Sequence, residues 1–318
     1  MQAVRSRLPA RRTGIWQQCR RRWQLFVFLL IPVVYTLVFA YYPMFGVQIA
    51  FKDFTAAMGI WGSKWVGFSH FERFFTSFQF NRVVTNTLWL SLYSLVASFP
   101  LAFIFALIIN TVRNQRFKKT IQTITYMPFF ISTVVIVALL NQVLNPVIGL
   151  YGNLYRMFIA DQYPANILGN PNYFRHLYVW SGVWQGLGWS TVIYIAALSA
   201  VDPQLHEAAQ IDGASRFRRI IHIDFPTIVP TASIMLILSA GNLMNVGFEK
   251  VYLMQNNMNL KYSEVITTYV YKTGMAAGSS NFSYASAIGL FNSVINCVLL
   301  VIVNWFSNKL NTDGTSLW

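Results

Sequence analysis

The chain has 318 residues, of which 55% are hydrophobic and only 11% charged, and its formal net charge is +14. Soluble domains carry about 25% charged residues, so this composition excludes an ordinary soluble protein. The lysines and arginines lie in short blocks between long apolar stretches, which is typical of a polytopic membrane protein.

Six apolar stretches are long enough to cross a membrane, which takes about 20 helical residues. They lie at 24–45, 85–110, 120–143, 178–200, 227–246 and 284–306. Each is expected to be a helix, because a bilayer core offers no water to satisfy backbone groups. The sequence therefore predicts an all-α membrane protein with a basic tail at 1–24, a six-helix transmembrane domain at 25–306 and a short C-terminal tail at 307–318.

The basic residues favour one orientation in the membrane. Fifteen of the 24 lysines and arginines lie in the segments that share a side with the termini, and nine lie opposite. The positive-inside rule therefore predicts that both termini are cytoplasmic. Topology and contact with membrane lipid account for the positive charge, so no nucleic-acid partner is expected.

The sequence contains no motif of the kind that binds a metal ion or a nucleotide. The two cysteines and four histidines have no metal-ligand spacing, and no glycine-rich phosphate-binding motif is present. We therefore expect no cofactor in this chain and no catalytic activity of its own.

The loop at 201–226 has unusual features for a membrane protein. Asp202 is typical of a helix N-cap, so a short helix is predicted over Pro203–Ile211. Gly213 can end that helix, and a second helix over Ser215–Ile223 is expected to stop before Pro226. Two short helices joined at an angle would form a rigid knob that fits a cleft in another protein.

In this loop the chain resembles the permeases of binding-protein-dependent importers. Their EAA signature is found at the required intervals as Glu207-Ala208-Ala209, Gly213, Ile223 and Phe225-Pro226, with Phe225 in place of the usual leucine. The resemblance implies the type I ABC importer permease (MetI-like) fold. It also implies that the loop is a coupling segment that docks onto a separate ATPase through Glu207, Ala208, Ala209, Asp212, Gly213 and Ala214.

The resemblance implies several partners in the plasma (inner) membrane. ATP and Mg²⁺ would be bound by two ATP-binding cassette subunits rather than by this chain. A second permease, expected to be a paralogue in a heterodimer, would form the other half of the path. A periplasmic or extracellular solute-binding protein would deliver the substrate.

Four strings resemble the carbohydrate branch of these permeases, which includes lipoprotein- and polysaccharide-type members and alginate importers. They lie at 42–54, 63–75, 86–92 and 289–296. The resemblance implies an oligosaccharide substrate, with acidic oligosaccharides such as alginate fragments as one option.

Aromatic and amide side chains in the last three predicted spans indicate a path for sugars. Aromatic rings stack on the C–H faces of sugars, and amides bind hydroxyl groups. Each asparagine pair is expected to share one helix face, and maltose-type permeases line their sugar site at the positions corresponding to 184–189. The expected path residues are Trp184, Gln185, Gly186, Trp189, Asn242, Asn245, Asn292 and Asn296. Interhelical hydrogen bonding and aromatic anchoring are the alternative roles for each.

Other functions stay open at this point. The same architecture could import an amino acid, phosphate or a peptide. A membrane-embedded transferase usually has an acidic pair or a metal site, but no Asp or Glu lies within the six predicted spans. A passive channel would have no use for the docking loop.

Overall fold

The computed structural model describes residues 23–159, 162–276 and 281–310. Most of the predicted N-terminal tail (1–24) and of the C-terminal tail (307–318) lies outside the described residues. The described chain is helical apart from one small sheet, in which β1 (Lys52–Asp53) pairs antiparallel with β2 (Lys64–Trp65).

The helices follow one another with short connections. The first half of the chain holds α2 (Trp23–Thr36), the π-helix η1 (Leu37–Tyr41), the 3-10 helix η2 (Tyr42–Phe51), α3 (Gly59–Gly62), α4 (Ser69–Phe75), α5 (Phe78–Asn110), α6 (Gln115–Tyr126), the 3-10 helix η3 (Met127–Phe130), α7 (Thr133–Val143) and α8 (Leu150–Phe158). The second half holds α9 (Pro171–Leu198), α10 (Pro203–Ile211), α11 (Arg216–Arg219), the π-helix η4 (Ile220–Asp224), α12 (Phe225–Gly241), α13 (Phe248–Met254), α14 (Leu260–Ser263), α15 (Ile266–Gly274) and α16 (Phe282–Leu310).

Four helical segments are long and apolar enough to cross a membrane: Trp23–Phe51, Phe78–Asn110, Arg216–Gly241 and Phe282–Trp305. The bent pair made by α6–η3 and α7 adds a fifth if it is one span. The predicted span at 178–200 lies mostly in α9, which has 28 residues but carries tryptophan, glutamine and glycine that lower its hydropathy. The helical membrane fold is confirmed, and the count of six spans stays a prediction.

The predicted span at 120–143 is not one continuous helix, so that part of the prediction is wrong. Pro128 lies in η3, where it cannot donate a helical hydrogen bond. Ser132 then begins a new helix, since its hydroxyl accepts a hydrogen bond from the backbone N–H of Val135 at 3.4 Å. The helices on the two sides of this break differ in direction by 96°.

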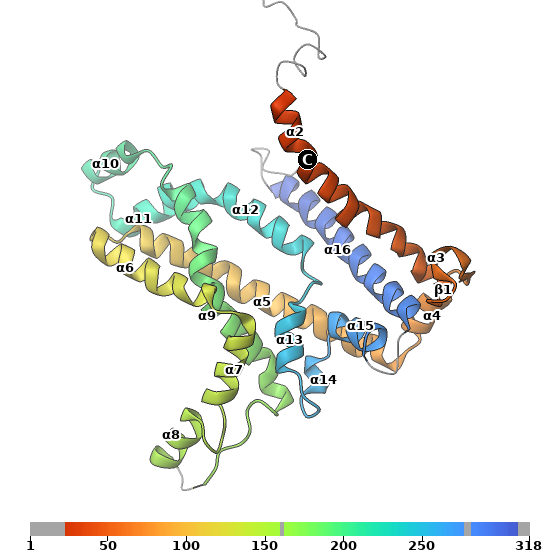
Figure 1. Cartoon of the computed structure of the whole chain (residues 1–318). Coiled ribbons are helices and arrows are strands. Elements are labelled where there is room, and N and C mark those ends of the chain that lie inside the picture. Colours follow the sequence, from red (N-terminus) through yellow and green to blue (C-terminus); the bar gives the residue numbers. More distant parts are fainter. Residues whose placement is uncertain (1–22, 160–161, 277–280, 311–318) are drawn as a thin grey trace, which may run out of the picture.

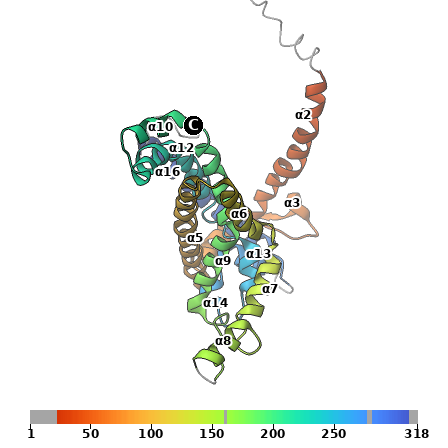
Figure 2. The same cartoon turned by 90° about the vertical axis from the view of Figure 1, so that its left-hand side faces the viewer.

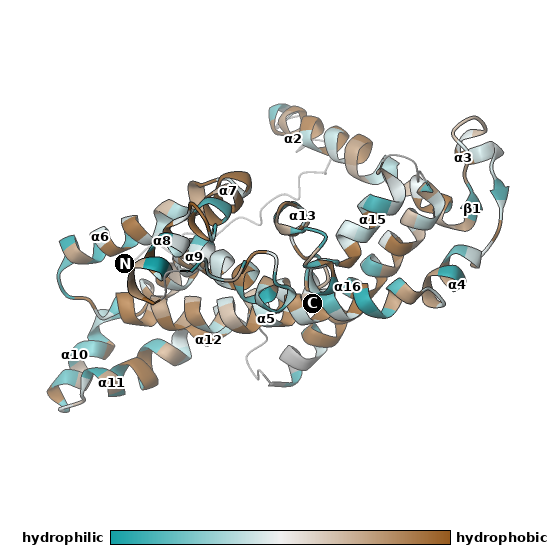
Figure 3. Cartoon of the chain, turned by 90° about the horizontal axis from the view of Figure 1, so that it is seen from below, coloured by the Kyte–Doolittle hydropathy of each residue, from teal (hydrophilic) through white to brown (hydrophobic). Residues whose placement is uncertain are grey.

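The centre of the molecule is built around α5 and α9, which pack along their lengths. One apolar cluster contains Leu90, Val183 and Val251 and joins α5 and α9 to α13. Another contains Ala106 and Ile228 and joins α5 to α12. Figure 3 shows hydrophobic residues along most of α5 and hydrophilic ones on α10.

α9 also lies very close to α6. A Cβ atom added to Gly188 would lie 2.2 Å from the carbonyl oxygen of Thr125, so only glycine allows this approach. The contact places the break after α6 beside the middle of α9.

The first helix stands apart from the rest of the molecule. None of the residues of α2 is buried, and Figure 2 shows it leaning away from the other helices. η2, at its base, packs against α16. An apolar helix without protein cover needs lipid or another chain around it.

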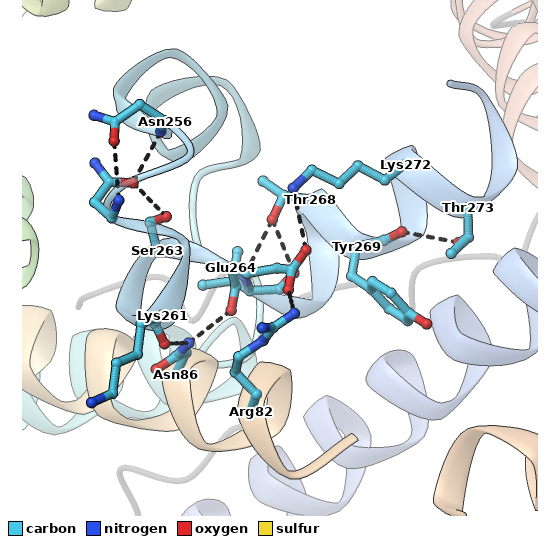
Figure 4. A network of polar contacts seen from close by, with 12 residues as sticks. Arg82, Asn86, Asn256, Lys261, Ser263, Glu264, Thr268, Tyr269, Lys272 and Thr273 are labelled. Carbon is cyan, nitrogen blue, oxygen red and sulfur yellow. Dashed lines mark hydrogen bonds and ion pairs between the residues drawn. The ribbon is translucent and has the colours of Figure 1, made fainter. Parts of the chain in front are cut away.

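A polar network fixes the end of the bundle that holds α14 (Figure 4). Glu264 forms ion pairs with Arg82 of α5 and with Lys272 of α15, the latter at 3.2 Å. The side-chain amide of Asn86 donates hydrogen bonds to the carbonyl oxygens of Lys261 and Glu264, both at 3.0 Å. α14 is therefore fastened to the beginning of α5.

Candidate functional site

α10 and α11 project at one end of the bundle, and α8 and α14 lie at the other (Figure 1). The side chain of Asp202 caps α10 by accepting a hydrogen bond from the N–H of Gln204 at 2.9 Å. Gly213 follows with φ = +74°, a conformation that other residues rarely adopt. Ser215 caps α11 by accepting from the N–H of Arg218 at 3.3 Å. The predicted caps and the break at Gly213 are confirmed.

The second helix of this loop does not stop before Pro226, so that prediction is wrong. Arg216–Gly241 forms one continuous helical segment of 26 residues that includes the π-helix η4. Proline lacks an N–H group and its ring collides with the preceding turn of a regular helix. The wider turn of η4, directly before Pro226, accommodates the proline without a helix end. The projecting loop is thus continuous with α12.

The surface of this loop carries apolar side chains and a carboxylate. Ile211 is 87% exposed, and Leu205 and Phe217 are exposed as well. The side chain of Glu207 is exposed, and its carboxylate forms no hydrogen bond or ion pair with another residue in the described part of the chain. Of the predicted coupling residues, Glu207, Ala208, Asp212 and Gly213 are exposed, and Ala209 and Ala214 are half-buried. The exposed apolar side chains form a surface that another protein could cover.

A buried carboxylate ties the loop to two long helices. Asp224, at the end of η4, is only 3% exposed. Its Oδ1 atom lies 3.3 Å from Nε2 of His206 on α10, and it accepts a hydrogen bond from the side-chain amide of Asn110 on α5, also at 3.3 Å. We call His206, Asp224 and Asn110 the latch. It connects α10 to the beginning of α12 and to the end of α5. No local sequence pattern predicts the latch, because its three residues are far apart in the chain.

Two cavities lie between the helices that the latch connects. The larger, of about 500 Å³, is bounded by α5, α9 and α12 and is lined by Trp189, Tyr194 and Met235 among others. The smaller, of about 210 Å³, is more polar and lies between α5, α9 and the segment after α12. Both are lined by Leu95, Ser98 and Ser239, so they adjoin.

Three of the predicted path residues line these cavities. The ring of Trp189 lines the larger cavity and stacks on Phe129, with ring centroids 4.6 Å apart. Asn242 and Asn245 line the smaller cavity. They do not share a helix face, because α12 ends at Gly241 and not at 246, and both lie in the break before α13. That part of the prediction is wrong, although the break still brings both side chains to one cavity.

Other predicted path residues lie outside the two cavities. The amide of Gln185 donates to the carbonyl oxygen of Ile131 at 3.0 Å and so fastens α9 to the break before α7. Trp184 is 53% exposed and lines neither cavity. A Cβ atom at Gly186 would meet open space.

The two predicted path asparagines of α16, Asn292 and Asn296, stabilise the break between α12 and α13. The side-chain oxygen of Asn296 accepts the N–H of Met244 at 2.8 Å, and the amide of Asn292 donates to Oδ1 of Asn245 at 3.0 Å. A backbone N–H released from a helix needs such a partner when it is buried. Asn292 and Asn296 therefore position the cavity lining and do not line either cavity themselves.

Sequence reasoning missed a row of hydroxyl groups in the smaller cavity. Ser91, Ser94 and Ser98 of α5 line it together with Ser239 and Tyr178. The three serines recur at helical spacing on one face of α5, which is the signal that could have found them.

A buried cation lies beside this region. Lys250 of α13 is 8% exposed, and its Nζ atom donates to the carbonyl oxygen of Tyr178 at 3.1 Å. No carboxylate in the described ranges pairs with it. Burial lowers the pKa of Lys250 to about 8.

A known protein family matches more than half of the chain. Residues 98–312 match the family described as binding-protein-dependent transport system inner membrane component. LplB of Bacillus subtilis is 39% identical over 300 residues, which cover 94% of this chain and 93% of that protein. YteP of the same organism, a polygalacturonan/rhamnogalacturonan transport system permease protein, is 41% identical over 91% of this chain and 89% of its own length.

The structure is also similar to solved transporters. A chain of a bacterial ABC transporter involved in the import of the acidic polysaccharide alginate superposes with a TM-score of 0.85 at 34% identity, covering 94% of this chain and all of that one. A chain of a bacterial alginate transporter in complex with its alginate pentasaccharide-bound periplasmic protein gives the same TM-score at 35% identity, covering 94% of this chain and 99% of that one.

Proposed function

Because the chain belongs to the family of binding-protein-dependent transport system inner membrane components, we propose that it forms half of the translocation path of an ATP-driven oligosaccharide importer. The observation that carries this proposal is the pair of adjoining cavities between α5, α9 and α12. Serine hydroxyls, asparagine amides and a tryptophan ring are the groups that bind sugars. The projecting loop is fastened to two of the same helices.

The coupling step follows from this connection. Partner ATPases that hold the loop would move α10 when they close on ATP. The latch passes that displacement to the end of α5 and the beginning of α12, because Asp224 holds both to α10. Both helices line the cavities, so their movement would open the path to one side of the membrane and then to the other.

An acidic oligosaccharide is the substrate that we favour. The polygalacturonan/rhamnogalacturonan permease and the alginate transporter are relatives whose names specify acidic polysaccharides or uronic acid polymers. Lys250 supports the same class, because a buried cation without a carboxylate partner raises the local concentration of anions. The ring of Trp189 offers a surface for the sugar.

The remaining partners complete the assembly. A paralogous permease would close the cavities and contact α2, none of whose residues is buried by the described part of this chain. Two ATPase subunits would bind ATP and Mg²⁺, and a periplasmic or extracellular binding protein would deliver the oligosaccharide. In this arrangement both termini are cytoplasmic, so reporter fusions after Gly62 and after Gln115 should report opposite sides. A periplasmic signal from the second fusion would contradict the orientation.

The substrate class can be tested on the complete importer in lipid. Stimulation of ATP hydrolysis is measured with uronate oligosaccharides, neutral oligosaccharides, an amino acid, phosphate and a peptide, each with the binding protein present. We expect uronate oligosaccharides to stimulate most. Stimulation by a neutral oligosaccharide alone would overturn the acidic substrate, and stimulation by the amino acid, phosphate or peptide alone would overturn the carbohydrate function.

A further inference from the structure

A third cavity, of about 580 Å³, lies between α5, α9 and α14 at the end of the bundle away from α10. Its volume is within the range of about 300–1,000 Å³ that is typical of small-molecule sites. The lining is divided into two halves. Trp89, Leu92, Tyr93 and Val96 of α5 form a largely apolar half, and Asn172, Arg175, His176 and Tyr262 form a polar half.

This cavity is separate from the solute path. Its α5 residues lie at 89, 92, 93 and 96, whereas those of the smaller path cavity lie at 91, 94, 95 and 98. At about 100° per residue, the two sets lie on opposite faces of the helix. Trp89 and Val96 are more than half exposed, so this face of α5 is turned toward the surroundings of the chain.

Arg175 is a cation that has no counterion among the described residues. Its Nη2 atom donates to Oδ1 of Asn86 at 2.9 Å, and its guanidinium carbon lies 4.6 Å from the ring centroid of Tyr262. The Nε atom is buried without a hydrogen-bond partner, and no carboxylate among the described residues pairs with the side chain. The free N–H group and the positive charge of such a guanidinium favour the binding of an anion, and its planar fork suits a phosphate or a carboxylate.

Hydrogen bonds hold the rim of the cavity in place. The hydroxyl of Tyr93 accepts from Nε1–H of Trp180 at 2.8 Å and shares a hydrogen bond with Nδ1 of His176 at 3.0 Å. Trp89 and Trp180 are exposed near the same end of α5 and α9. Tryptophan and tyrosine gather where the hydrocarbon core of a membrane meets the headgroups. The polar half of the cavity therefore lies at headgroup level.

We propose that this cavity binds an anionic phospholipid, with the phosphate on Arg175 and an acyl chain along Leu92 and Val96. Val96 lies about 10 Å along the helix axis from Trp89, toward the middle of the span. A cationic end at headgroup level and an apolar end directed into the hydrocarbon core match a lipid, whereas an oligosaccharide would leave the apolar half unused. In the orientation proposed above, the lipid belongs to the outer leaflet. The site is independent of the solute path and extends the proposed function.

The test uses the complete importer in nanodiscs of phosphatidylcholine with or without phosphatidylglycerol. Native mass spectrometry counts the phosphatidylglycerol that stays bound. Arg175→Gln keeps a donor for Asn86 but removes the charge, and it should lower retention roughly tenfold. Leu92→Trp fills the apolar half without touching any charge and should lower retention as well. Arg156→Gln is the matched control, since Arg156 is exposed on α8 and bonded to Asn153.

Three results would overturn the proposal. Unchanged retention in both variants would place the lipid elsewhere. Displacement of phosphatidylglycerol by a uronate oligosaccharide would make the cavity a sugar site. Absence of retained phosphatidylglycerol in the unmodified importer would mean that the second permease covers this face. Normal size-exclusion profiles and basal ATP hydrolysis of the variants exclude misfolding, and a failed substrate panel would leave this measurement unaffected.

Discussion

The latch offers the sharpest test of the proposed coupling between the projecting loop and the helices that line the cavities. Asp224 is 3% exposed and has two hydrogen-bonding partners among the described residues, His206 and Asn110. Removal of the imidazole in His206→Ala therefore leaves the buried carboxylate with one of them. A hydrogen bond to a charged group contributes about 1.5–3 kcal/mol. The His206 side chain is 26% exposed, which lowers the value to about 1–2 kcal/mol. The attachment of α10 to α12 should therefore weaken roughly 5- to 30-fold.

The assay compares transport with ATP hydrolysis in reconstituted importers. A loosened latch lets the ATPases move α10 without moving α5 and α12, so the amount of substrate transported per ATP should fall several-fold while binding of the ATPases persists. Asp224→Asn should act in the same direction, and the double variant should lose less than the sum of the two single effects. His222→Ala is the control, because the one side-chain hydrogen bond of His222 among the described residues is to the carbonyl oxygen of Arg218 in its own helical segment. A normal transport ratio in both single variants would refute the reasoning.

Three further predictions concern the loop, the path and the buried cation. Glu207→Lys reverses the exposed charge, and Gly213→Val adds about 1–3 kcal/mol of backbone strain at φ = +74°. Both variants should weaken copurification of the ATPase while membrane insertion stays normal. Trp189→Ala should impair transport without loss of ATPase binding, whereas Trp184→Ala should transport normally; the opposite pattern would move the path to the other face of α9. Burial lowers the pKa of Lys250 from 10.5 to about 8, so thermal stability should rise with pH between these values, where the unfolded chain still holds the proton. Lys250→Met should raise thermal stability at pH 7 and flatten its increase with pH. An unchanged dependence of stability on pH would contradict the lowered pKa of Lys250.

Local signals explain why the loop could be predicted from the sequence. Asp202, Ser215 and Gly213 act through the backbone within a few residues of themselves, so their caps and break are encoded where they stand. The end of the second helix is the part of this loop where the prediction is wrong. Pro226 disfavours a regular helix, but the π-turn that accommodates it has no distinct sequence pattern.

The end of α12 shows the limit of local reasoning. Leu243, Met244 and Val246 continue the apolar run, so hydropathy extends the span to 246 although the helix ends at Gly241. The N–H of Met244 can leave the helix because Asn296, on α16, accepts it. That acceptor is distant in the chain, and nothing in the sequence around 241 announces it. Asn242 and Asn245 therefore reach one cavity through a contact that the sequence pattern does not contain.

α12 joins the two parts of the proposed mechanism. At its beginning, Asp224 holds it to the projecting loop, and directly after its end, Asn242 lines the smaller cavity. A helix transmits displacement along its axis because its backbone hydrogen bonds resist extension. The break after Gly241 interrupts this series of hydrogen bonds. Asn296 ties the far side of the break to α16, so a movement that enters at Asp224 is taken up at the break. The smaller cavity lies at that point, so in the proposed mechanism its lining would be the part of the structure that changes when the loop moves.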